Sequence, residues 1–189
     1  GTGAEQVLLR YFDQNEHVSW DDFEWVNLKI EDMNAALAGG SIEAFTAWEP
    51  TPAIAEAQGV GRALRSYGDI ALVPVSVHTT RAFAADHRDE IVKFLAAHAD
   101  KVDMIQQDPA RAAELAAQAA SEQGIEVSAD AFRRIFQRVD FSLEVDEDVL
   151  ASIRDTAEFL HENGKIDTVP EFSWDGSILE EANDLRAGN

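Results

Sequence analysis

Two short stretches of the sequence hold residues suited to a small ligand. Small residues at positions 1–4 precede an apolar run, and a helix start built from them lets a ligand approach free backbone N–H groups where the dipole favours negative charge. Positions 47–50 place an indole beside a carboxylate, which suits a ligand with an apolar or cationic part. The predicted ligand-binding residues are Thr2, Gly3, Ala4, Trp48 and Glu49.

Each stretch also has a purely structural interpretation. Thr2 and Glu5 have the spacing of a capping box, in which two side chains satisfy the helix start and nothing binds there. Trp48 is a lone tryptophan, and such residues most often belong to a hydrophobic core. Alternation along residues 42–48 puts Trp48 and Glu49 on opposite faces. They can converge on one ligand only if the chain turns at Glu49 and Pro50.

Patterns for catalysis or metal binding are missing from the sequence. Gly59 and Gly61 lack the third glycine of a dinucleotide loop, where Leu64 stands. The five histidines form no HxxxH pair, and the chain has no cysteine, so thiolate nucleophiles and cysteine metal sites are excluded. The acids at 146–148 fit a helix start better than a calcium loop. We therefore expect no catalytic residue, no metal site and no cofactor.

The charge of the chain excludes other classes. Its 189 residues hold 36 acidic and 15 basic side chains, a net charge of −21. Nucleic acids and anionic membranes are bound through Lys and Arg, so neither is an expected partner, and no apolar run is long enough to insert into a membrane. Because an acidic, lysine-poor surface remains hydrated at high salt, we expect a halophilic source; an ordinary acidic protein is the alternative.

The elements expected around these residues alternate in the first part of the chain. Alternating apolar residues predict strands at 23–28, 42–48 and 70–77, and residues 141–143 look extended. Helical spacing and caps predict helices at 3–15, 30–38, 51–58, 110–121, 128–138 and about 178–186. They also predict a helix of about twenty residues that carries Ile91 to Ile105 and stops at Asp108 and Pro109, and a helix marked by Val149 to Leu160 that ends at Gly164. Such alternation is typical of an α/β protein with a parallel sheet.

Several motifs, taken in order, resemble those of one transporter family. They are GTGA at 1–4, AALAGGSIEA at 35–44, WEP at 48–50, the stretch 71–77 followed by FAADH at 83–87 and VKFL at 92–95, and EFL at 158–160 with GKI at 164–166. The family is the nitrate/sulfonate/taurine-type substrate-binding proteins of ABC importers, with thiamine-precursor binders among its relatives. The resemblance covers nearly the whole chain.

The resemblance implies a periplasmic-binding-protein-like (type II) two-lobed α/β fold. Residues 1–105 would form the second lobe with its ligand-facing loops, and residues 106–189 a C-terminal helical segment that returns to the first lobe. Family members carry an export signal and most of a first lobe ahead of the motif at 1–4. We therefore expect the chain to begin inside the second lobe.

The function implied is that of a solute-binding component, not an enzyme, which delivers its ligand to an ABC permease outside the cytoplasm. Its ligand would be a small organic sulfonate, zwitterion or nitrogenous compound. Glu5 and Glu49 depart from the sulfonate-binding pattern and favour a zwitterionic or nitrogenous solute. The alternatives are an enzyme on the same scaffold, similar to thiamine-pyrimidine synthases or a desulfinase, and a LysR-type effector domain.

Overall fold

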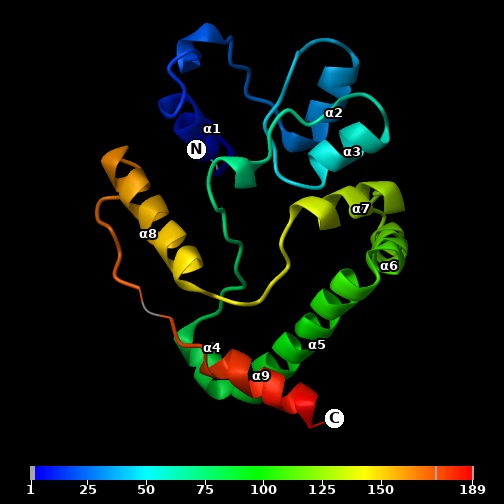
Figure 1. Cartoon of the computed structure of the whole chain (residues 1–189), viewed down its shortest axis with the longest axis vertical. Coiled ribbons are helices and arrows are strands. Elements are labelled where there is room, and N and C mark those ends of the chain that lie inside the picture. The colour runs from blue at the N-terminus through cyan, green and yellow to red at the C-terminus, as the bar shows by residue number, and fades with distance from the viewer. Residues whose placement is uncertain (1–2, 173, 189) are drawn as a thin grey trace. The chain divides into compact units, whose positions relative to one another are not determined.

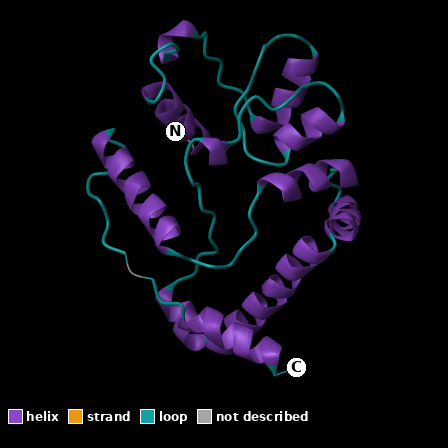
Figure 2. Ribbon diagram, in the orientation of Figure 1, coloured by secondary structure: helices purple, strands orange, loops and turns teal. Residues whose placement is uncertain are grey.

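The computed structural model describes residues 3–172 and 174–188, and within them helices are the only regular secondary structure (Figure 2). The α-helices, labelled in Figure 1, are α1 (Gly3–Asp13), α2 (Ile30–Ala38), α3 (Thr51–Ala57), α4 (Arg81–Asp86), α5 (Arg88–Gln107), α6 (Pro109–Glu122), α7 (Ala129–Arg138), α8 (Glu147–Glu162) and α9 (Ser177–Ala187). Two short 3₁₀ helices, η1 (Trp20–Asp22) and η2 (Tyr67–Asp69), lie between them.

Local capping explains why the later helices begin where the sequence predicts. The side chain of Asp108 accepts a hydrogen bond from the Arg111 N–H at the start of α6, where Pro109 is the first helical residue. Ser128 caps α7 in the same way, and Asp146 caps α8 by accepting from Val149. The helices predicted from spacing and caps are confirmed.

The predicted strands at 23–28, 42–48 and 70–77 are wrong for the described residues. The backbone is extended at Phe23, an aromatic residue of a type that favours this conformation. A strand also needs a neighbour that exchanges N–H and C=O hydrogen bonds, and none of these segments has such a neighbour within residues 3–172 and 174–188. Val75 is accordingly 94% exposed.

The chain forms two compact units. The first comprises the residues up to Ala71 together with Asp108–Asp140, and the second comprises Leu72–Gln107 and the residues from Phe141 onward. The chain therefore passes between the units near residues 71, 107 and 140. The lobe boundary at residues 105 and 106 stays a prediction.

Small side chains form the core of the first unit. Helix α7 packs against both α6 and α3, and α3 also packs against α2. Ala53, Ala113 and Ala131 are completely buried at these contacts, and Ile135 is nearly so. Alanine lets helix backbones approach closely but removes little apolar surface from water, so each contact stabilises the unit only modestly.

The second unit is built on the pairing of α5 with α9. Val92 and Ala96 of α5 pack against Ala182 of α9, with Leu95 and Ile178 beside them. Ion pairs flank this core. Each joins an arginine to acids on the other helix: Arg88 to Glu181 at 2.7 Å, and Arg186 to Asp100 at 2.9 Å and to Asp103.

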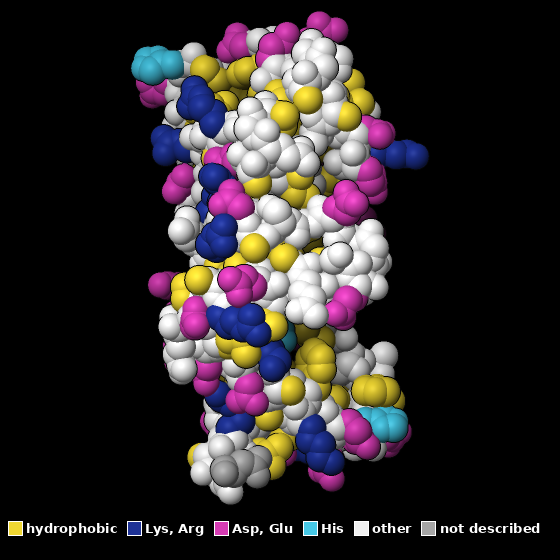
Figure 3. Space-filling view, turned by 90° about the vertical axis from the view of Figure 1, so that its right-hand side faces the viewer, with side chains coloured by type: hydrophobic (Ala, Val, Ile, Leu, Met, Phe, Trp, Pro, Cys, Tyr) yellow, Lys and Arg dark blue, Asp and Glu magenta, His cyan; other side chains and the backbone are white. Residues whose placement is uncertain are grey.

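Acidic side chains are spread over the surface. On the face shown in Figure 3 they are dispersed among apolar and basic side chains and do not gather into one patch. A net charge of −21 on the chain implies general self-repulsion among these side chains.

Candidate ligand-binding site

The predicted ligand contacts near the amino terminus lie at the start of α1, in the first unit. Thr2 lies outside the described residues. Gly3 is exposed, and apart from its chain neighbours and the backbone of its own helix nothing approaches within 4 Å of the position that a Cβ would take there. Ala4 is buried against the unit with 6% of its surface exposed. The helix start is therefore open at Gly3 and closed by packing at Ala4.

Trp48 lies on the non-helical segment that leads into α3. Its side chain is 52% exposed, so the indole is not part of the hydrophobic core. The chain turns at Glu49 and Pro50, directly after Trp48. Without a turn, the side chains of Trp48 and Glu49 would lie on opposite faces of the segment. The turn therefore allows both side chains to reach one ligand. Whether Trp48 contacts a ligand stays a prediction.

Both carboxylate oxygens of Glu49 are engaged within the protein. Oε1 accepts from Nη1 of Arg138 at 3.1 Å, and Oε2 accepts from the backbone N–H of Ala53 in the first turn of α3 at 3.1 Å. The Glu49 side chain is 20% exposed. Glu49 therefore ties the start of α3 to the end of α7, and a ligand ammonium would have to share this carboxylate with Arg138.

Arg138 binds a second carboxylate, that of Glu56 on α3. Burial works against the charge of Arg138, but hydrogen bonding to Glu56 and the charges of Glu56 and Glu49 raise its pKa above the ordinary value. Burial likewise acts to raise the pKa of Glu56, but hydrogen bonds from Arg138 and Ala63 lower it below 4.5. Arg138 and Glu56 are thus held in their charged forms.

A hydrogen bond on the other side of Trp48 fixes the same segment. The hydroxyl groups of Thr46 and Tyr67 are 2.8 Å apart, which joins the segment to η2. Burial raises the pKa of Tyr67, and the contact with Thr46 opposes this shift in part. The sequence patterns did not single out Tyr67 or Arg138, because neither belongs to a local motif.

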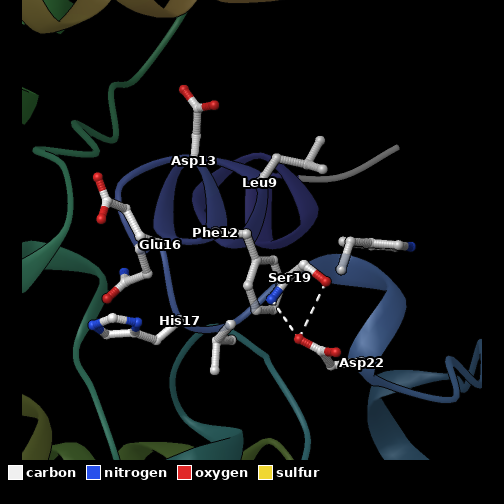
Figure 4. Close-up of a pocket in the computed structure, with 10 residues that line it drawn as sticks. Leu9, Phe12, Asp13, Glu16, His17, Ser19 and Asp22 are labelled. Carbon is white, nitrogen blue, oxygen red and sulfur yellow. Dashed lines mark hydrogen bonds between the residues drawn. The ribbon is translucent and has the colours of Figure 1, made fainter.

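Two hollows open on the first unit, and the predicted contacts among the described residues line neither. One, about 460 Å³, lies between the end of α1 and η1 (Figure 4). The other, about 430 Å³, lies between α3 and the loop before α7. In the described part of the chain, no group of three or more His, Asp or Glu side chains is arranged to hold a metal ion.

Comparison with known proteins identifies the family. Residues 1–120 match the model of the NMT1-like family. Because the match spans more than half of the 189 residues, the chain belongs to the NMT1-like family. No curated protein and no solved structure matches it.

Membership in this family supports the resemblance to nitrate/sulfonate/taurine-type binding proteins, and it is consistent with a solute-binding protein of an ABC importer. It also confirms the periplasmic-binding-protein-like fold class, although the described residues form no sheet. None of the helices in the described residues has the length and apolar character needed to cross a membrane.

Proposed function

We propose that the chain acts in the solute-binding component of an ABC importer, outside the cytoplasm. It captures a small organic sulfonate, zwitterion or nitrogenous compound and delivers it to a membrane permease. The observation that carries this proposal is the NMT1-like match, which covers residues 1–120 and so includes both predicted ligand stretches. The role is binding without catalysis.

The geometry suggests which part of the ligand each of the two stretches would contact. The open backbone at Gly3 suits a negatively charged group, since helix N–H groups and the dipole favour anions. The exposed indole of Trp48 suits an apolar or heteroaromatic part. Glu49 is already paired with Arg138, so its preference for an ammonium group is weaker than that of a free carboxylate. A zwitterionic or nitrogenous solute fits this set.

Calorimetric titration with taurine, ethanesulfonate and a neutral pyrimidine tests the proposal. We expect at least one of them to bind saturably and Trp48→Ala to weaken it by about 1–3 kcal/mol, the value of burying an aromatic face. Trp174 is a matched control, because it is 51% exposed against 52% for Trp48 and lies in the other unit. Trp174→Ala should leave the affinity unchanged.

Three results would count against the proposal. If none of the solutes binds saturably, the chain is not a receptor for this class. If both tryptophan variants weaken binding equally, Trp48 has no special place in the site. If taurine or the pyrimidine is recovered in altered form after incubation, the enzyme alternative replaces binding without catalysis.

A further inference from the structure

In the second unit, helix α8 is followed directly by an asparagine–glycine pair. Asn163 is the only asparagine of the sequence that precedes a glycine. Both residues are exposed, and apart from its chain neighbours nothing lies within 4 Å of the position that a Cβ would take at Gly164. Because glycine has no side chain, nothing on Gly164 screens its backbone nitrogen from the side-chain amide before it. Asn163 is therefore the asparagine of this chain best suited to spontaneous deamidation.

The reaction uses only the atoms of this pair and water. The backbone nitrogen of Gly164 attacks Cγ of Asn163, the bond from Cγ to Nδ2 breaks, and ammonia leaves with the proton that the backbone nitrogen gives up. The five-membered imide that results takes up one water molecule, which opens the ring at either carbonyl. The product is an aspartate, or an isoaspartate in which the backbone runs through the side chain. In sum, an amide and a water become a carboxylic acid and ammonia.

The folded end of α8 opposes this reaction at both reacting groups. The backbone N–H of Gly164 donates to the carbonyl of His161 at 3.0 Å. Nδ2 of Asn163 donates to the backbone carbonyl of Phe159 at 2.8 Å. The attacking nitrogen and the leaving amide are thus each held by a hydrogen bond of the helix end, so the reaction requires that this end of the helix open first.

Helix α8 is held mainly by the hydrogen bonds at its two ends. Asp146 accepts from the N–H of Val149 at 2.9 Å at its start. At its end the N–H of Lys165 donates to the carbonyl of Leu160 at 2.8 Å, which with the Gly164 bond completes a Schellman motif. Ala157 is the one buried residue along α8, all of which the structure describes. A helix with so little buried surface is of the kind that opens locally.

We infer that Asn163 is a deamidation site whose rate is set by opening of the Schellman motif at the end of α8. The product then keeps the motif from re-forming. A carboxylate at this position cannot donate to the carbonyl of Phe159, and its negative charge lies at the helix end where the dipole disfavours anions. An isoaspartate adds a carbon to the backbone, which changes the spacing between the donors and acceptors of the motif.

Peptide mapping by mass spectrometry tests this assignment on the full chain, incubated at neutral pH with and without urea. Conversion at Asn163 should be roughly tenfold or more faster in urea, because the folded chain reacts only when the helix end opens. Gln123 is the internal control, since it precedes Gly124 in the same motif at the end of α6. Its longer side chain would have to close a six-membered ring, so it should stay unconverted in both conditions.

Asp146→Ala tests whether α8 controls the rate. It removes the cap at the far end of α8 without touching the reacting pair, so conversion at Asn163 should rise about fivefold in the folded chain and stay unchanged in urea. Ser128→Ala is the matched control, because it removes the equivalent cap of α7 in the first unit. It should leave the rate at Asn163 unchanged.

Amide hydrogen exchange tests the effect of the product. Asn163→Asp should speed exchange across the last turn of α8, since this variant lacks the donor to Phe159. Asn27→Asp adds the same charge at an exposed residue of the first unit, and it should leave exchange in α8 unchanged. This comparison stands even if Asp146→Ala fails to fold.

Four outcomes would overturn the inference. No conversion at Asn163 in urea would show that the pair is not a deamidation site. Equal rates with and without urea would show that the folded helix end gives no protection. Equal acceleration by Asp146→Ala and Ser128→Ala would show that global unfolding sets the rate. Unchanged exchange in Asn163→Asp would show that the product leaves the motif intact.

Discussion

Arg138 and Glu49 stand 89 residues apart in the sequence, yet Nη1 of Arg138 donates to Oε1 of Glu49 at 3.1 Å. This ion pair brings the last turn of α7 to the segment that displays Trp48. With Glu56 as the second partner of Arg138, one guanidinium balances two partly buried carboxylates between α3 and α7. The segment with Trp48 and Glu49 is therefore held by α7, a helix that none of the family motifs covers.

Arg138→Met should destabilise the chain, because it leaves Glu49 and Glu56 partly buried without their cation. We expect the free energy of unfolding to fall by about 1–3 kcal/mol in denaturant titration, the cost of leaving a buried charged group without its hydrogen bond. Arg133 is the control: it lies on the same helix and pairs at 3.4 Å with Asp130, and both side chains are over 40% exposed. Arg133→Met should cost about 0.5 kcal/mol or less. Equal costs would show that the Arg138 pairs contribute nothing specific.

Glu56 should make stability depend on acid pH. Its pKa is lower in the folded chain than the ordinary 4.5, so the unfolded chain takes up its proton first as the pH falls. The stabilisation from Glu56 is fully present above 4.5 and is lost as the pH falls through the lowered folded pKa. The unfolding free energies of the wild type and Glu56→Gln, measured from about pH 7 to about pH 3, should differ most near neutrality and converge in acid. A difference that stays constant over this range would contradict the prediction.

Salt should stabilise the chain. The chain carries a net charge of −21, and molar salt shortens the Debye length to about 3 Å, which screens the repulsion between the acidic side chains. We expect the melting temperature to rise between about 0.1 M and about 2 M NaCl. Sodium sulfate at equal ionic strength separates screening from general salting-out, because screening alone gives the same rise in both salts. A flat or falling melting temperature would exclude a halophilic adaptation.

What the sequence could predict was local. The helices α6, α7 and α8 follow Asp108, Ser128 and Asp146, and each of these side chains caps an N–H group three residues further on. The starts of the three helices could therefore be predicted from a few adjacent residues. Residues 70–77 show the limit of such reasoning. Alternating valines favour an extended backbone, but they do not say which segment would pair with it, and within the described residues none does.

The site shows the same limit. Trp48 and Glu49 could be proposed as ligand contacts from their residue types and their adjacency. The partner of Glu49 could not, because no local pattern indicates which distant carboxylate an arginine at the end of a helix will bind. The contact between the rings of Phe23 and Trp25, by contrast, is local. Phe23 and Trp25 stand two residues apart, so an extended backbone places them on one side of the chain, and their rings lie 5.6 Å apart. Their contact with Phe12 depends on the intervening turn.

Trp48 lies between two fixed points, the Thr46–Tyr67 hydrogen bond before it and the Glu49–Arg138 ion pair after it. The backbone of residues 46–49 therefore has little freedom left to lose when a ligand settles on the indole. Ordering a loose loop costs about 1–2 kcal/mol for each residue fixed, and here that entropy is lost when the chain folds. A solute that stacks on Trp48 keeps most of its contact energy as affinity.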